Sequence, residues 1–203
     1  MITIHHLGRS QSERIIWLCE ELGVPYELKR YERTAVGFAP DEYKALYPFG
    51  TAPVITDGDV VLGESGAISD YVIARYGDGR LSVGQSEPGF ADYLYWFHFA
   101  NGSMMPSAMT DLVVDILGGP GDNEVVRIFK ERSGVALAAV ERQLGRTSYI
   151  AADELTAADI LIHFPLKMMH SHPARTDQAR PNINRYLQRL GERPAFVRAM
   201  ARA

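Results

Sequence analysis

A proline at the entrance to an apolar run is the feature that most constrains what this 203-residue chain can fold into. The run covers residues 49–55, and Pro53 stands directly before Val54 and Ile55. Because proline has no backbone N–H, Pro53 fits at the first position of a strand but not inside a paired one. A cis Ala52–Pro53 bond would turn the backbone groups of Ala52 outward, where they can pair with an extended peptide. The segment therefore predicts a strand that begins beside a peptide-binding edge.

An acid and a hydroxyl, Glu64 and Ser65, follow nine residues after Ile55, at the start of an expected helix. The first N–H groups of a helix have no intrahelical acceptor, and they attract a carboxylate. Together with the proline segment, this pair predicts a pocket for a small, charged, peptide-like ligand.

The composition excludes several other classes of protein. The net charge of −4 gives no electrostatic case for binding nucleic acid or an anionic membrane. The chain opens without a signal-peptide pattern, and no apolar run approaches the roughly 20 residues that span a bilayer. Cys19 is the single cysteine, which rules out an intrachain disulfide, a paired-cysteine redox site and a cysteine-rich zinc site. We therefore expect a cytoplasmic protein.

The hydrophobic pattern changes character along the chain. Residues 1–78 alternate between short apolar runs and amphipathic stretches, which predicts an α/β domain with a thioredoxin-like β-α-β-α-β-β-α order. A Gly-, Ser- and Pro-rich linker follows over residues 79–87. Residues 88–203 predict an all-α domain. The expected strands cover residues 2–6, 25–29, 54–56 and 60–62, and the expected helices cover residues 10–22, 41–46, 64–76, 90–117, 123–144, 156–170, 183–190 and 194–202.

Two serines open the first expected helix. Ser10 and Glu13 have the spacing of a capping box, in which the Ser10 hydroxyl accepts from the Glu13 N–H. A hydroxyl carries one donor and two acceptor sites, so Ser10 can cap the helix and still donate to a bound sulfur. A thiol of pKa ~8.5 becomes mostly thiolate at pH 7 after a two-unit drop, or roughly 2.7 kcal/mol. Ser12 is the alternative donor.

These elements occur in the order of a known family. The run His5–Ile15 corresponds to a strand-to-helix activating loop, and residues 17–26 resemble a W-L-L-E-E-L-G-x-P-Y run. Residues 47–54 resemble an N-P-x-G-K-x-P element, and residues 64–68 match E-S-x-A-I. Residues 156–160 match a helical-domain capping motif. Over essentially its whole length, the chain resembles cytosolic-type glutathione S-transferases, and residues 95–106 resemble a bacterial and fungal branch.

The resemblance implies a role for each part of the site. The backbone of Ala52 would pair with the cysteinyl unit of glutathione, Ser65 would hold the γ-glutamyl carboxylate, and Glu64 would face its amine. It also implies glutathione as cosubstrate without a metal, a small hydrophobic electrophile, and a homodimer. The implied glutathione contacts are Ser10, Thr51, Ala52, Pro53, Glu64 and Ser65, the thiol activator is Ser10 or Ser12, and the second-substrate pocket includes Met104, Met105 and Met109.

The chain departs from the family pattern at three positions. His5 stands where many relatives carry a thiol-activating tyrosine, although a strand histidine is more often a packed side chain. Phe49 and Thr51 replace basic residues that would hold the glycine carboxylate of glutathione. The nearby cations that can compensate are Lys44, Arg33 and Arg9.

Two further groups receive structural interpretations. Thr156 and Asp159 predict a buried capping box that starts a core helix. His170 and His172 are one residue apart, but no neighbouring acid or cysteine completes a metal site.

The resulting prediction is a glutathione S-transferase that attaches the glutathione thiolate to electrophiles or uses it to reduce peroxides, as in detoxification. Two alternatives stay open. One is a non-catalytic protein-interaction or regulatory module with the same fold. The other is a specialised glutathione-dependent isomerase or dehalogenase.

Overall fold

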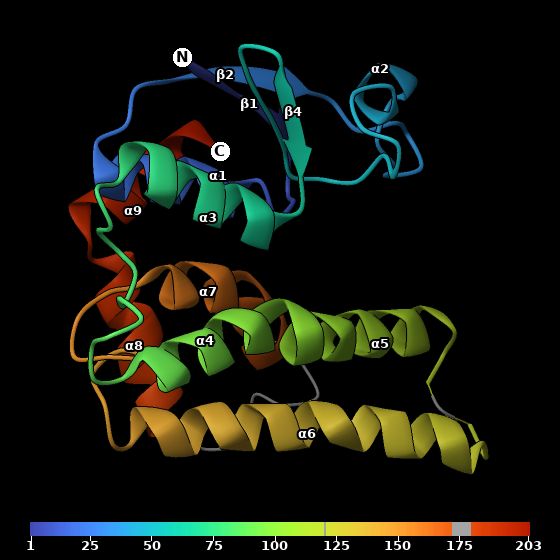
Figure 1. Cartoon of the computed structure of the whole chain (residues 1–203). Helices are drawn as coiled ribbons and strands as arrows, with labels where there is room; N and C mark the ends of the chain where they lie inside the picture. The colour runs from blue at the N-terminus through green and yellow to red at the C-terminus, as the bar shows by residue number, and fades with distance from the viewer. Residues whose placement is uncertain (120, 172–179) are drawn as a thin grey trace. The chain divides into compact units, whose positions relative to one another are not determined.

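The computed structural model describes residues 1–119, 121–171 and 180–203, which divide into two compact units (Figure 1). The first unit comprises Met1–Ser82 and Gly191–Ala203, and the second comprises Val83–Leu190. Within the described ranges, no helix combines the length and the apolar character needed to cross a bilayer.

The first unit is a four-stranded mixed sheet with helices, as the thioredoxin-like prediction requires. The strand order is β2-β1-β3-β4; β1 and β2 are parallel, and the other pairs are antiparallel. The elements of this unit are β1 (Ile2–Leu7), α1 (Glu13–Leu22), β2 (Tyr26–Tyr31), α2 (Asp41–Lys44), β3 (Val54–Asp57), β4 (Val60–Gly63), α3 (Ser65–Tyr76) and α9 (Pro194–Arg202).

Helix α1 is the central core helix of this unit. Its apolar side chains, including Ile15, Leu18 and Cys19, are fully buried. Burial raises the pKa of the Cys19 thiol to about 12, so the thiol stays protonated at neutral pH. The helix ends at Gly23, whose φ of 65° lies in the left-handed region that glycine adopts without steric cost.

The C-terminal helix α9 packs against α1 and belongs to the first unit. Trp17 and Phe196 meet edge to face with ring centroids 4.9 Å apart. Arg193 forms a two-pronged ion pair with Glu21, with N–O distances of 2.7 and 2.9 Å. The sequence-based division placed residues 191–203 in the helical domain. Their position reflects these long-range contacts, which hydrophobic periodicity does not encode.

The second unit is entirely helical over its described residues. Its elements are α4 (Phe90–Phe99), the π-helical turn η1 (Ala100–Met104), α5 (Met105–Ile116), α6 (Glu124–Leu144), α7 (Ala157–His170) and α8 (Pro181–Gly191). The single helix expected over residues 90–117 is therefore interrupted. Pro106 explains the wide turn, because proline cannot donate to the carbonyl four residues earlier and its ring crowds that carbonyl.

Helix α7 begins with the predicted capping box of Thr156 and Asp159. The buried Asp159 carboxylate also accepts from the Ile150 N–H and the Tyr186 hydroxyl, at 2.8 and 2.7 Å. Burial raises the pKa of Asp159, and these donors act in the opposite direction. The motif thus ties the start of α7 to a preceding loop and to α8.

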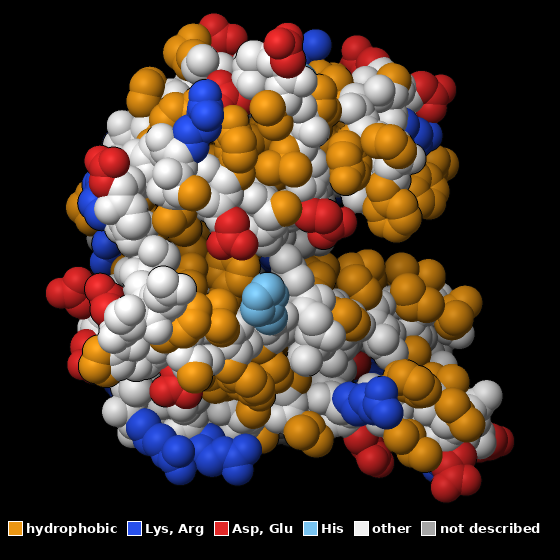
Figure 2. Space-filling view, in the orientation of Figure 1, with side chains coloured by type: hydrophobic (Ala, Val, Ile, Leu, Met, Phe, Trp, Pro, Cys, Tyr) orange, Lys and Arg blue, Asp and Glu red, His pale blue; other side chains and the backbone are white. Residues whose placement is uncertain are grey.

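Apolar side chains also lie on the surface of the second unit. They gather over the C-terminal end of α5 and the N-terminal end of α6, at the right of the helical unit in Figure 2. The exposed members of this group are Val113, Ile116, Leu117, Val125, Ile128 and Phe129.

Candidate functional site

The strand register brings the predicted glutathione-binding segments to one edge of the sheet. Val54, the first residue of β3, pairs with His5 of β1 and with Gly63 of β4. Pro53 precedes Val54 and Glu64 follows Gly63, so the two residues lie side by side. The Ala52–Pro53 bond is cis, which is the condition under which the sequence predicted a peptide-binding edge here. The same edge carries the end of β1, from which the loop to α1 departs.

Helix α3 begins at this edge with Ser65. The preceding residue, Glu64, has φ 66° and ψ 115°, an uncommon conformation for a residue with a side chain. Such outliers cluster at binding sites, where the surrounding structure imposes them. Glu64 is exposed and Ser65 is buried, so this turn presents an acid to solvent beside a hydroxyl and the N-terminus of a helix.

Arg14 connects the two helix starts of the site. Its buried guanidinium donates from Nη1 to Ser65 Oγ across 3.0 Å, which links the first turn of α1 to the first residue of α3. Burial lowers the pKa of Arg14 to about 9, so the group stays cationic at neutral pH. Sequence reasoning missed this residue. The sequence did hold a signal for it: Arg14 stands directly beside Ile15 on the apolar part of an amphipathic helix, which indicates a buried arginine that needs a polar partner.

Ser10 and Ser12 are in direct contact. Their hydroxyl oxygens lie 2.8 Å apart, and the Ser12 N–H donates to Ser10 Oγ at 3.3 Å. Ser12 Oγ is also 2.8 Å from Nδ1 of His6. The predicted capping box is wrong: α1 begins at Glu13, whose N–H donates to the Ser10 carbonyl instead of the hydroxyl. The Ser10 hydroxyl is engaged by Ser12, a contact that the capping pattern does not reveal.

His5 has partners inside the sheet. Its Nδ1 lies 2.9 Å from the Tyr31 hydroxyl, and its Nε2 lies 3.3 Å from Thr56 Oγ1. Burial, assisted by Lys29, lowers the pKa of His5. This arrangement matches the packed strand histidine that was the commoner expectation.

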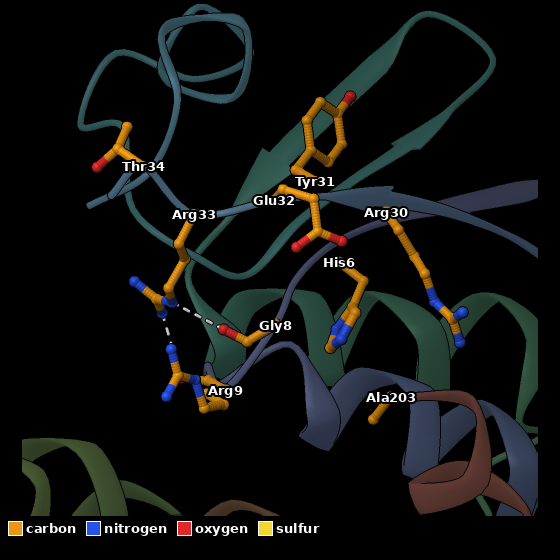
Figure 3. A pocket seen from close by; sticks show the side chains of 9 residues that line it. All are labelled: His6, Gly8, Arg9, Arg30, Tyr31, Glu32, Arg33, Thr34 and Ala203. Atoms are coloured by element: carbon orange, nitrogen blue, oxygen red, sulfur yellow. Dashed lines mark hydrogen bonds between the residues drawn. The ribbon is translucent and has the colours of Figure 1, made fainter. Parts of the chain in front are cut away.

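Two of the three candidate cations, Arg33 and Lys44, have partners within the protein. Arg33 donates to the carbonyls of Gly8 and Arg9, at 2.8 and 3.2 Å (Figure 3). It also donates to the Gly37 carbonyl at 2.7 Å. Its guanidinium therefore organises the loop after β1. Lys44 pairs with Asp41 at 2.9 Å on an exposed part of the surface.

A cavity of about 380 Å³ opens beside this loop in the first unit. Side chains of His6, Arg9, Arg30, Glu32 and Arg33 line it (Figure 3). Three of these side chains carry guanidinium groups, so the cavity is rich in hydrogen-bond donors.

Comparison with known proteins gives a consistent result over both units. Family profiles for the N-terminal and C-terminal domains of glutathione S-transferases match residues 5–80 and 103–194. Glutathione S-transferase 3 of Schizosaccharomyces pombe is 31% identical over 207 residues, covering 96% of this chain and 85% of the relative. The chain belongs to the glutathione S-transferase family.

Solved structures of glutathione S-transferases agree in fold. One from Actinobacillus pleuropneumoniae is 35% identical with a TM-score of 0.89, covering 100% of this chain and 92% of the other. A theta-class enzyme from Xanthomonas axonopodis pv. citri, solved with glutathione bound, is 25% identical with a TM-score of 0.77. It covers 98% of this chain and 96% of the other.

In this glutathione S-transferase, the three methionines of the predicted electrophile pocket have different surroundings. Met104, in η1, is fully buried and Met105 is nearly so, whereas Met109 is partly exposed. A separate cavity of about 420 Å³ in the helical unit is lined by Tyr95, Phe99 and neighbouring residues, and not by these methionines.

Over the described parts of this glutathione S-transferase, no group of three or more His, Cys, Asp or Glu side chains is placed to hold a metal ion. His170 Nε2 lies 2.7 Å from Asn184 Oδ1. His172 lies outside the described residues.

Proposed function

We propose that this family member joins the thiolate of glutathione to small electrophilic molecules or reduces peroxides with the same thiolate. The proposal rests on what lies together at one edge of the sheet in the first unit. This edge carries the Ser10 hydroxyl, the cis peptide bond of Pro53 and the start of the helix that begins with Ser65. The three features correspond to the thiol, the backbone and the γ-glutamyl end of one peptide-like ligand.

The γ-glutamyl end is assigned to the start of α3. The Ser65 hydroxyl and the N–H groups of the first turn take its carboxylate, and the exposed Glu64 faces its amine. Arg14 Nη1 donates to Ser65 Oγ at 3.0 Å, so its guanidinium adds positive charge close to the same carboxylate. The cysteinyl unit pairs with the backbone of Ala52, flanked by Thr51 and Pro53.

The glycine carboxylate is assigned to Lys44. Arg33 already donates to three backbone carbonyls, whereas the Lys44 ammonium is half exposed on α2. The stem of Lys44 packs beside Gly50, next to Phe49 and Thr51. One ammonium in this position compensates for the basic residues that those two positions lack.

Ser10 is assigned to the glutathione sulfur. A hydroxyl that donates to a thiolate, near the positive end of α1, favours the ionised form and lowers the thiol pKa. Holding the electrophile beside that sulfur makes the bimolecular step effectively unimolecular. Because the nucleophile belongs to glutathione, the buried Cys19 is not required.

The electrophile pocket is assigned to the helical unit around η1 and α5, with Met105 and Met109 in its wall and Met104 beneath them. Methionine adapts to ligands of varied shape. A specialised isomerase or dehalogenase would keep the same glutathione contacts and differ in this pocket. A non-catalytic interaction module would bind glutathione without turnover.

A homodimer and a cytoplasmic location complete the proposal. Support for a dimer comes from Phe49, which is 76% exposed, and from the apolar cavity beside Tyr95 and Phe99. An exposed aromatic side chain and an apolar cavity are complementary features. The cytoplasmic location rests on the composition and the single cysteine.

Calorimetric titration with reduced glutathione tests the binding site. We expect saturable binding by the wild type and a loss of roughly 10-fold or more in Ser65→Ala, because a hydrogen bond to a charged group contributes about 1.5–3 kcal/mol. Ser69→Ala is the matched control, since Ser69 lies one turn further along α3 and donates to the Ser65 carbonyl. Equal affinity in wild type and Ser65→Ala would contradict the assignment.

A further inference from the structure

Three buried side chains form a continuous hydrogen-bonded series in the first unit, here named the serine relay: His6, Ser12 and Ser10. Nδ1 of His6 lies 2.8 Å from Ser12 Oγ, which lies 2.8 Å from Ser10 Oγ. Their exposed fractions are only 2%, 0% and 7%, respectively. Protein groups therefore decide the direction of each hydrogen bond in the series.

The Ser12 backbone restricts the direction at Ser10. Its N–H donates to Ser10 Oγ at 3.3 Å, which occupies one of the two acceptor sites of that oxygen. If the Ser12 hydroxyl donates to Ser10 as well, both acceptor sites are filled. The Ser10 proton is then directed away from Ser12 and is available to a ligand. The competing acceptor for the Ser12 proton, the Leu7 carbonyl, is more distant at 3.5 Å.

This direction requires a proton on Nδ1 of His6, which then donates to Ser12. Burial, together with the positive charge of Arg30, lowers the pKa of His6, so the ring is neutral and carries a single N–H at neutral pH. Which of the two ring nitrogens carries this proton depends on the hydrogen-bonding groups around the other nitrogen, Nε2.

The cavity beside β2 is lined by more cationic donor groups than acidic acceptor groups. His6 lines it together with Arg9, Arg30 and Arg33, whose guanidinium groups donate and cannot accept (Figure 3). Glu32 is the acidic side chain among the lining residues. Surroundings dominated by donors favour a bare Nε2 and a protonated Nδ1, which is the tautomer that the serine relay needs.

We propose that His6 is a positioning residue, which donates through Ser12 and thereby directs the Ser10 hydroxyl proton at the glutathione thiolate. The inference rests on the proposed function, because the thiolate is the ligand that receives the proton. Successive hydrogen bonds of one direction polarise each other, so the Ser10 hydroxyl becomes a stronger donor than an isolated serine. His6 itself does not touch glutathione.

The test measures the pKa of the bound glutathione thiol, from the ultraviolet absorbance of its thiolate as a function of pH. We expect His6→Leu to raise this pKa by about 0.5–1 unit, since loss of one hydrogen bond in the series weakens the final donor. The same variant should lower kcat and leave KM for glutathione nearly unchanged. His6→Asn, which retains an N–H close to the position of Nδ1, should restore most of the wild-type value.

His5→Leu is the matched control. His5 precedes His6 on β1 and points to the opposite face, where it contacts Tyr31 and Thr56. Both variants therefore remove a buried histidine from β1, so any general effect of that loss should appear in both. Only His6→Leu should shift the thiol pKa.

Ser12→Ala keeps the test decisive if His6→Leu does not fold. It interrupts the series at its middle and should raise the thiol pKa by a similar amount. Where His6→Leu does fold, the double variant His6→Leu/Ser12→Ala should be no worse than Ser12→Ala alone, because both positions act on Ser10 along one path. A normal thiol pKa in folded His6→Leu or Ser12→Ala would overturn the serine relay while leaving the proposed function intact. Absence of glutathione binding in the wild type would overturn the proposed function itself.

Discussion

Ser10 and Ser12 have similar burial but differ in what their hydroxyls still offer a ligand. Ser12 Oγ lies within 2.8 Å of both His6 Nδ1 and Ser10 Oγ, so its donor and acceptor sites are engaged inside the protein. Ser10 lies at the end of this series. We therefore propose Ser10 as the thiol activator, where the sequence left both residues open.

Separate alanine variants distinguish the two serines. We expect Ser10→Ala to lower kcat/KM by about 10- to 100-fold, because it removes a hydrogen bond to a charged group of about 1.5–3 kcal/mol. Ser12→Ala should lower it by less, roughly 5-fold, because only the polarisation of Ser10 is lost. Steady-state kinetics with a chromogenic electrophile measures both. A larger loss in Ser12→Ala than in Ser10→Ala would exchange their roles.

At the scale of single elements, short-range signals determine where helices start and stop. Helix α1 ends at Leu22, and the Thr156 capping box starts α7, both as the sequence predicted. The turn η1 shows a local signal that was overlooked: the hydrophobic period continues through Pro106, but a proline changes the hydrogen bonding of the preceding turn. Helix period and helix continuity are therefore separate properties.

Asp159 offers the clearest test at this scale. Asp159→Ala would leave the Tyr186 hydroxyl and the Ile150 and Thr156 N–H groups without their acceptor in a buried site. We expect the free energy of unfolding to fall by about 3–5 kcal/mol.

Urea unfolding followed by circular dichroism measures this loss. The matched control is Asp153→Ala, an exposed acid in the preceding loop, which should change stability by no more than about 0.5 kcal/mol. A similarly small effect of Asp159→Ala would show that the capping box does not hold α7.

At the scale of the whole molecule, the exposed apolar surface is the feature that a single copy leaves unexplained. Phe49 is 76% exposed, and apolar side chains gather on α5 and α6 (Figure 2). Scattered apolar residues are ordinary on a surface, but contiguous patches mark interfaces. A second copy of the chain is the partner that we propose.

Phe49→Ser tests the proposed dimer. A twofold interface contains each contact twice, and burial of one Phe side chain contributes about 1.5–3 kcal/mol, so the loss is roughly 3–6 kcal/mol. We expect the dimer dissociation constant to rise by about 100-fold or more, as measured by sedimentation velocity over a range of concentrations. Phe38→Ser is the control, from the same unit and with similar exposure. An unchanged dissociation constant in Phe49→Ser would remove Phe49 from the interface.

The sequence by itself determined the properties that depend on neighbouring residues. Periodicity identified most helices and strands, and the spacing of Thr156 and Asp159 predicted the capping box. These features need only a few consecutive residues, since backbone geometry and local hydrogen bonds fix them.

Only the tertiary structure decided the contacts between segments distant in the chain. It attached α9 to α1 through Trp17 and Phe196, placed Arg14 behind Ser65, and joined His6 to Ser12 in place of a Ser10 cap. A buried polar group must find a partner, and which partner it finds depends on what the fold brings within hydrogen-bonding distance. The order of residues in the sequence does not give these distances, because distant segments come close only when the strands and helices pack together.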